Sequence, residues 1–135
     1  MLRTLICYLL AAVFLVAGVL HFTQLDAFAS IVPPALPFPR LIVQLTGVIE
    51  IVLAFGLLLP RTRAATGWLL AAYLLAVLPA NIYMAVARIP LGETVLPDWA
   101  LWFRVLLQFP LIGLVLWACR SFPTRASLAK PRRSP

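Results

Sequence analysis

Four long apolar runs, separated by polar or proline-containing breaks, dominate the pattern of hydrophobic and polar positions along the chain. The runs cover residues 5–22, 41–59, 64–87 and 99–119. Each run is about 18 to 24 residues long, and an α-helix of that length crosses a hydrocarbon core about 30 Å thick. The pattern therefore predicts an all-α membrane protein, a single bundle of four transmembrane helices formed by residues 1–120.

Composition supports the bilayer as the surrounding solvent. Of the 135 residues, 64% are hydrophobic and only 11% are charged, whereas about a quarter of the residues in a soluble domain are charged. A disordered chain is also excluded, because it would leave too much apolar surface in water.

The distribution of basic residues indicates the topology. The net charge is +7, and five of the eleven basic residues lie in the last sixteen positions. Four spans put both termini and the basic turn at 60–63 on the same side, and that side carries most of the arginines and the lysine. Because basic residues collect on the cytoplasmic side, we expect a multi-pass protein of the inner (plasma) membrane with both termini in the cytoplasm.

The same distribution predicts that the basic tail at 121–135 is a disordered cytoplasmic segment, and that nucleic acid is not a partner. A cleaved signal peptide is the alternative interpretation of the first run. It is disfavoured because the run is long enough to span, and because the small-residue pattern Ala27-Phe28-Ala29 lies well beyond the end of the run.

The first outward-facing loop, at 23–40, is unusual because it is both apolar and rich in proline. We expect it to begin as a short interfacial helix and then to run extended along the membrane surface. Two interpretations remain open: the loop is a lid over the outer end of the bundle, or it is a connector that lies on the membrane.

Polar side chains inside the spans form the candidate ligand-binding site, because such groups are expensive in lipid and normally face the bundle interior. The five residues are His21, Glu50, Asn81, Arg104 and Gln108. A rise of 1.5 Å per residue places them in one layer in the outer half of the bilayer. This layer is either a structural polar core built on an ion pair between Glu50 and Arg104, or a site for a small molecule or a proton.

Two prolines inside the spans predict an irregular outer half. Pro79 frees the carbonyl of Leu75, and Pro110 frees that of Leu106, because proline has no backbone N–H group. Freed carbonyls at membrane depth need partners. The amides of the candidate site, Asn81 and Gln108, are the expected donors.

The sequence lacks the common catalytic and metal-binding motifs, which excludes several classes of enzyme. Cys7 and Cys119 are far apart in sequence and form no CxxC pair, so we interpret them as small apolar helix residues. The sequence has no phosphate loop and no HExxH motif, and His21 is its only histidine. A self-contained hydrolase, haem protein or metalloenzyme is therefore not expected, and neither is a metal site.

Several short motifs resemble those of the DoxX-like family of small membrane proteins. They are His21-Phe22, Ile31-Val32-Pro33-Pro34, Leu59-Pro60-Arg61-Thr62-Arg63 and Pro79-Ala80-Asn81-Ile82-Tyr83-Met84-Ala85. The resemblance covers about residues 14–118. It implies a four-helix bundle with both termini inside, and a link to quinone-associated sulfur oxidation, but no mechanism.

Three functional hypotheses follow. The first is an accessory or small-ligand-binding subunit linked to quinone-type membrane redox chemistry, with a membrane redox partner or a second copy of the chain as its partner. No specific motif supports a quinone as the cofactor. The second is a small proton-coupled transporter, against which a pairing of Arg104 with Glu50 would count. The third is a scaffold or assembly factor with a purely structural polar layer.

Overall fold

The structure, a computed structural model, describes residues 1–120. The predicted disordered tail at 121–135 lies outside the described residues. Over residues 1–120 the elements are α1 (Leu2–Thr23), α2 (Leu25–Ala29), α3 (Pro39–Leu58), α4 (Arg63–Ala87) and α5 (Asp98–Cys119). Apart from α2, each helix is long and apolar enough to cross a membrane, which confirms the prediction of four candidate spans. The side on which the termini lie stays a prediction.

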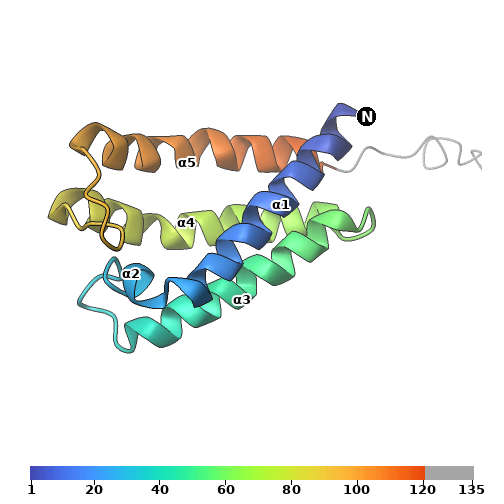
Figure 1. Cartoon of the computed structure of the whole chain (residues 1–135). Helices are drawn as coiled ribbons and strands as arrows, with labels where there is room; N and C mark the ends of the chain where they lie inside the picture. The colour runs from blue at the N-terminus through green and yellow to red at the C-terminus, as the bar shows by residue number, and fades with distance from the viewer. Residues whose placement is uncertain (121–135) are drawn as a thin grey trace, which may run out of the picture.

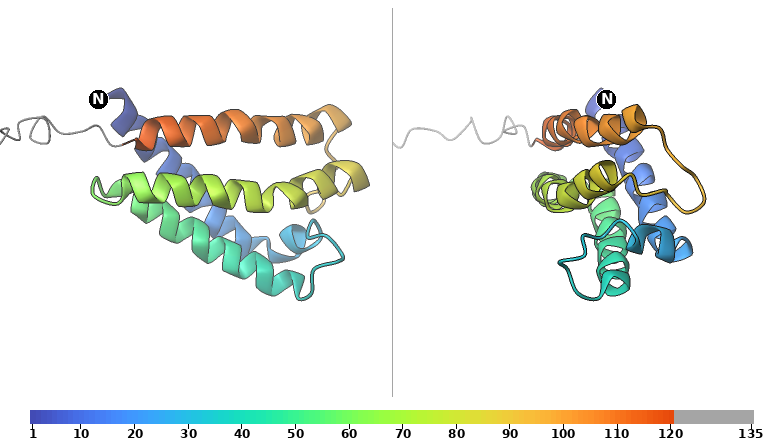
Figure 2. Two further views of the ribbon diagram at one scale, coloured as in Figure 1. Left: turned by 180° about the vertical axis from the view of Figure 1, so that it is seen from behind. Right: turned by 90° about the vertical axis from the view of Figure 1, so that its left-hand side faces the viewer.

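The four long helices form two pairs. Helix α1 packs along α3, and α4 packs along α5. The pairs lie close together where α3 turns into α4, and they diverge toward the opposite end (Figures 1 and 2). We call the first end, which holds Met1, the turn at 59–62 and Arg120, the short-turn end. The other, which holds α2 and the loops at 30–38 and 88–97, is the long-loop end.

Proline and left-handed residues set the boundaries at the long-loop end. Phe38 adopts a left-handed conformation with φ of 55°, and Pro39 then opens α3, a position that suits proline because the first turn needs no backbone donor. Arg88 ends α4 with φ of 52°, and its backbone N–H donates to the carbonyl of Met84. The short helix predicted at the start of the first loop is present as α2.

Two glycines let α1 and α3 touch backbone to backbone. A Cβ atom on Gly18 would lie 2.9 Å from the carbonyl oxygen of Gly47. A Cβ atom on Gly47 would lie 2.8 Å from the Cβ atom of His21. Small residues at helix contacts permit such close approach in membranes. The contact brings the end of α1 against the middle of α3, one turn from Glu50.

Apolar packing differs between the two ends. One cluster of buried side chains, including Leu10, Leu57, Leu70 and Val115, fills the space between the helix pairs toward the short-turn end. A second, smaller cluster packs α4 against α5 at the long-loop end and includes Ile31 from the first loop. The first loop is therefore anchored to the helix pair that lies across the bundle from α3.

Candidate functional site

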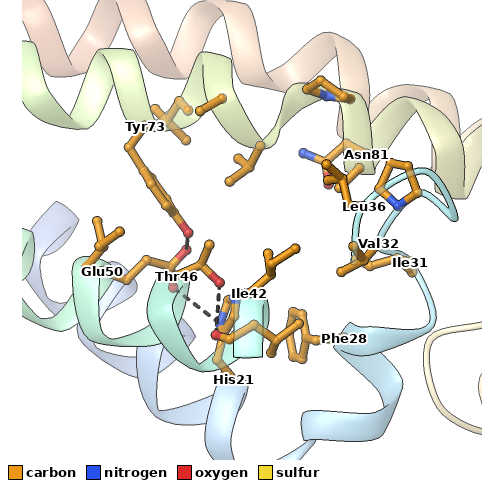
Figure 3. A pocket seen from close by; sticks show the side chains of 18 of the residues that line it. His21, Phe28, Ile31, Val32, Leu36, Ile42, Thr46, Glu50, Tyr73 and Asn81 are labelled. Carbon is orange, nitrogen blue, oxygen red and sulfur yellow. Dashed lines mark hydrogen bonds and ion pairs between the residues drawn. The ribbon is translucent and has the colours of Figure 1, made fainter. Parts of the chain in front are cut away.

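A cavity of about 420 Å³ opens between α3 and α4 at the long-loop end, where the helix pairs diverge (Figure 3). Its volume lies in the range of small-molecule sites, about 300–1,000 Å³. Four of the five predicted site residues line it: His21, Glu50, Asn81 and Arg104. The fifth, Gln108, is buried at 4% exposure and hydrogen-bonds to Asn81. The rest of the wall is mostly aliphatic.

The first loop closes one side of this cavity. Phe28 of α2 and Ile31, Val32 and Leu36 of the following loop all line it. The ring of Phe28 stacks on the imidazole of His21, with centroids 4.3 Å apart and the planes inclined by 21°. Of the two interpretations left open for this loop, the packing favours the lid.

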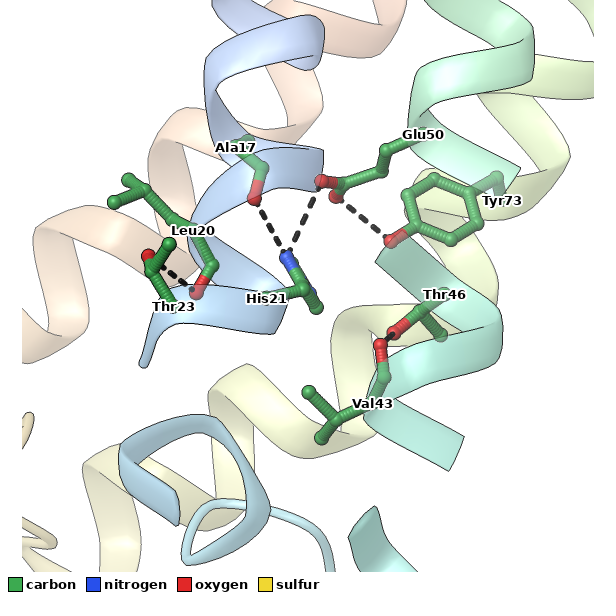
Figure 4. A network of polar contacts seen from close by, with 8 residues as sticks. All are labelled: Ala17, Leu20, His21, Thr23, Val43, Thr46, Glu50 and Tyr73. Carbon is green, nitrogen blue, oxygen red and sulfur yellow. Dashed lines mark hydrogen bonds and ion pairs between the residues drawn. The ribbon is translucent and has the colours of Figure 1, made fainter. Parts of the chain in front are cut away.

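Glu50 is the buried acid on the cavity wall, and only one of its carboxyl oxygens has a hydrogen-bond donor. Tyr73 of α4 donates its hydroxyl to Oε1 at 2.7 Å. The other oxygen, Oε2, lies 3.4 Å from Nδ1 of His21 but makes no hydrogen bond among residues 1–120 (Figure 4). Nδ1 is also 2.8 Å from the carbonyl oxygen of Ala17, so a proton on Nδ1 has that carbonyl as its closer acceptor. A buried oxygen without a donor is costly.

The remaining polar residues form a chain of hydrogen bonds between α5 and α4. Arg104 donates from Nε to Oδ1 of Asn81 at 3.1 Å, and Asn81 donates from Nδ2 to Oε1 of Gln108 at 2.8 Å. Gln108 in turn donates to the backbone carbonyl of Leu74. Both side-chain amides therefore have their oxygen and nitrogen engaged, as buried amides require.

The ion pair between Glu50 and Arg104, on which one of the two interpretations of the polar layer was built, does not form. Over residues 1–120 the ion pairs within 4.0 Å are His21 with Glu50, Arg40 with Asp26, and Arg88 with Asp98. Helix α3 packs against α4 and not extensively against α5, and the Nε atom of Arg104 is held by Asn81. Both side chains nevertheless border the same cavity. The acid instead meets Tyr73 and His21.

The prediction that Asn81 and Gln108 donate to the proline-freed carbonyls is wrong: Asn81 donates to Gln108, and Gln108 donates to a carbonyl that no proline frees. Gln108 does donate to a backbone carbonyl of α4, but to that of Leu74, one residue before Leu75. Leu74 is buried at 6% exposure while Leu75 is 53% exposed, and Gln108 itself is buried. The amide therefore meets the carbonyl of the residue on the buried side of the helix.

Sequence reasoning missed Tyr73 and Gly18. Tyr73 counted as one more apolar residue of its span, although a phenol deep in a membrane helix needs a hydrogen-bond partner, which was the available signal. Gly18 is a glycine inside a membrane-spanning run, and a small residue at such a position was the available sign of close helix contact. Among residues 1–120, no group of three His, Cys, Asp or Glu side chains is placed to hold a metal ion.

Comparison with known proteins adds a family and no activity. Neither the curated proteins nor the solved structures include a significant match to the chain. One family matches residues 10–121, which is most of the chain, and it is not the DoxX-like family that the motifs resemble. The chain belongs to the family described as a domain of unknown function, DUF8561.

Proposed function

We propose that this protein binds a small amphipathic molecule in the lidded cavity at the long-loop end. The observation that carries the proposal is Oε2 of Glu50, a buried carboxyl oxygen on the cavity wall that lacks a hydrogen-bond donor. A polar atom of a ligand would satisfy it. The aliphatic wall would hold the apolar part of the same molecule.

The cavity makes specific demands on the ligand. The free carboxyl oxygen of Glu50 requires a hydrogen-bond donor from the ligand. Arg104 has guanidinium N–H groups beyond the one that binds Asn81, so it can donate to an acceptor on the ligand. A quinol, with its hydroxyl groups on an apolar ring, meets the first demand, and the carbonyl oxygens of a quinone meet the second. On this basis we propose an accessory subunit near the quinone pool of a bacterial-type inner membrane, with the long-loop end facing outward. The motifs that resemble those of DoxX-like proteins are the support for a distant kinship with that family.

The polar layer divides into two parts with different roles in this proposal. The chain of hydrogen bonds from Arg104 through Asn81 and Gln108 to α4 is closed, and it fixes the register of α4 against α5 as a scaffold would. The part formed by His21 and Glu50 faces the cavity and leaves Oε2 of Glu50 without a hydrogen bond. Ligand binding is assigned to this part, with Arg104 contributing from its edge.

A proton-coupled transporter remains the second candidate, because the structure removes an argument against it. Glu50 is not held in an ion pair by Arg104, so its carboxyl is available to exchange a proton for a substrate. Against transport, the buried cluster that includes Leu10, Leu57 and Leu70 fills the bundle between the cavity and the short-turn end. A binding site open to one side therefore fits the packing better.

The binding proposal is tested with purified protein in lipid nanodiscs and a short-chain ubiquinol analogue kept reduced, because its hydroxyl groups can donate to Oε2 of Glu50. We expect saturable binding by wild type, and a loss of at least tenfold in affinity for Glu50→Gln. The matched control is Val52→Ala, on the same helix but 62% exposed and outside the cavity lining, which should bind as wild type does. Native mass spectrometry of material extracted with its own lipids should show a bound small molecule in the control and not in Glu50→Gln.

Equal binding by wild type, Glu50→Gln and Val52→Ala would reject the site. If wild type binds no quinol but retains a different molecule that is lost in Glu50→Gln, the quinol is rejected as the ligand while the cavity is retained as the binding site. Uptake into vesicles driven by a proton gradient and abolished by Glu50→Gln would favour the transporter.

A further inference from the structure

Cys7 of α1 and Cys119 of α5 lie side by side at the short-turn end, although 112 positions separate them in sequence. Their sulfur atoms are 4.0 Å apart, and both thiols are free. Cys7 is 0% exposed and Cys119 is 5% exposed. The expectation of small, buried helix residues is met, but the sequence separation gave no sign of this contact. A disulfide needs the sulfurs at about 2 Å, so a small rotation of the two side chains is required.

The surrounding packing holds the two thiols together. Gly67 of α4 lies behind Cys119, and a Cβ atom on it would lie 2.4 Å from the Cβ atom of Cys119. The missing side chain lets α4 support α5 at this point. Cys7 donates its thiol to the carbonyl oxygen of Ala118 at 3.6 Å, and Arg3 donates to the carbonyl of Trp117. These two bonds attach the first two turns of α1 to the last turn of α5.

Access to the two thiols is unequal. Cys119 lines two hollows of about 300 and 290 Å³ at the short-turn end, and Cys7 lines neither. A small reagent therefore reaches Cys119 first. The Cys7 sulfur lies 4.0 Å from the Cys119 sulfur, in position to attack that sulfur once it is part of a mixed disulfide.

We propose that Cys7 and Cys119 form a reversible intramolecular disulfide by exchange with a small organic disulfide. One sulfur of that disulfide bonds to Cys119, and its other half leaves as a thiol with the proton from Cys119. Cys7 then attacks the Cys119 sulfur, the Cys7–Cys119 bond forms as the bond between Cys119 and the reagent breaks, and the second half leaves as a thiol with the proton from Cys7. Two protein thiols are oxidised and one organic disulfide is reduced to two thiols.

The bond would join the two helix pairs at the end opposite the cavity. Helix α1 belongs to the pair with α3, and α5 to the pair with α4. The oxidised chain would therefore keep the pairs closed at the short-turn end. The predicted topology places this end in the cytoplasm, where thiols rest reduced and disulfides are typically redox-sensing.

The test uses dithiodipyridine on the full chain in nanodiscs, with intact mass and absorbance as readouts. We expect wild type to release two thiopyridone molecules per chain, to lose the mass of two hydrogen atoms and to retain no adduct. Trypsin should then yield residues 4–40 linked to residues 105–120, and a phosphine reductant should separate them. The oxidised chain should also unfold at a higher temperature than the reduced chain.

Two variants separate the roles of the thiols. Cys7→Ser should keep a stable pyridyl adduct on Cys119, whereas Cys119→Ser should react at least tenfold more slowly, because Cys7 has no exposed surface. Stable adducts on both cysteines of wild type, links between two chains, or no reaction until the protein is unfolded would each overturn the proposal. If a variant fails to fold, the intact mass and the peptide map of wild type still show whether the intramolecular disulfide forms. None of these results depends on a ligand in the cavity.

Discussion

The close contact of α1 with α3 gives the sharpest prediction, which concerns Gly47→Ala. The added methyl group would lie 2.8 Å from Cβ of His21, 2.9 Å from Cε2 of Phe22 and 3.1 Å from the carbonyl oxygen of Gly18. The last of these is backbone, so the helices themselves must separate. Such overpacking typically costs about 1–3 kcal/mol.

The loss of glycine from the helix has a smaller, stabilising effect that opposes this overpacking. Replacing a glycine inside a helix with alanine gains about 0.5–1 kcal/mol, because the unfolded chain loses conformational freedom. The expected net result for Gly47→Ala is a loss of about 0 to 2.5 kcal/mol in the free energy of unfolding, and the loss relative to the same change at a helix glycine that meets no neighbour is the full cost of about 1–3 kcal/mol. Any separation of α1 from α3 also moves His21 away from Glu50, so binding in the cavity should weaken together with stability.

Gly113→Ala is the matched control. A Cβ atom on Gly113, within α5, meets nothing within 4 Å, so this variant should be as stable as wild type or slightly more stable. Unfolding in detergent is followed in a Cys119→Ser background with a maleimide dye, which then reports exposure of Cys7, a side chain with no exposed surface in the folded chain. If Gly47→Ala unfolds at the same temperature and denaturant concentration as Gly113→Ala, the close helix contact does not exist as described.

Three further predictions concern the polar layer and the topology. Tyr73→Phe removes the donor to Glu50 and should lower the free energy of unfolding by about 1–3 kcal/mol; Tyr83→Phe on the same helix should change it by less than about 0.5 kcal/mol, and equal effects in the same unfolding assay would contradict the assigned bond. A double-mutant cycle with Asn81→Ala and Gln108→Ala should give a coupling energy of about 0.6 kcal/mol, up to about 1.7, and a value near zero would mean that the amides do not interact. Reporter fusions to the N-terminus and to the loop at 88–97 should place the first in the cytoplasm and the second outside; the reverse pattern would invert the assignment of the long-loop end.

The arrangement of the candidate site could be predicted only in outline. Hydropathy and the cost of polar groups in lipid were enough to select His21, Glu50, Asn81 and Arg104, which do line one cavity. Their pairing was not predictable, because depth along a helix says nothing about which helices are neighbours. Glu50 and Arg104 lie on α3 and α5, which do not pack extensively against each other.

The amino-acid sequence alone determined the number of long helices and their approximate limits. Run length, proline breaks and the scarcity of charge are local properties, and the thickness of the bilayer converts them directly into spans. The short helix at the start of the first loop was foreseen in the same way. These features do not depend on how the helices meet.

Tertiary structure decided everything that rests on contact between distant segments. The lid over the cavity, the bond of Tyr73 to Glu50 and the meeting of Cys7 with Cys119 all follow from which faces pack together. Those faces are chosen by small residues such as Gly18 and Gly67, where the missing side chain admits a neighbouring helix. In an almost uniformly apolar chain such steric choices leave little trace in hydropathy, since lipid and protein interior are equally apolar and hydrophobicity does not separate a buried face from an exposed one.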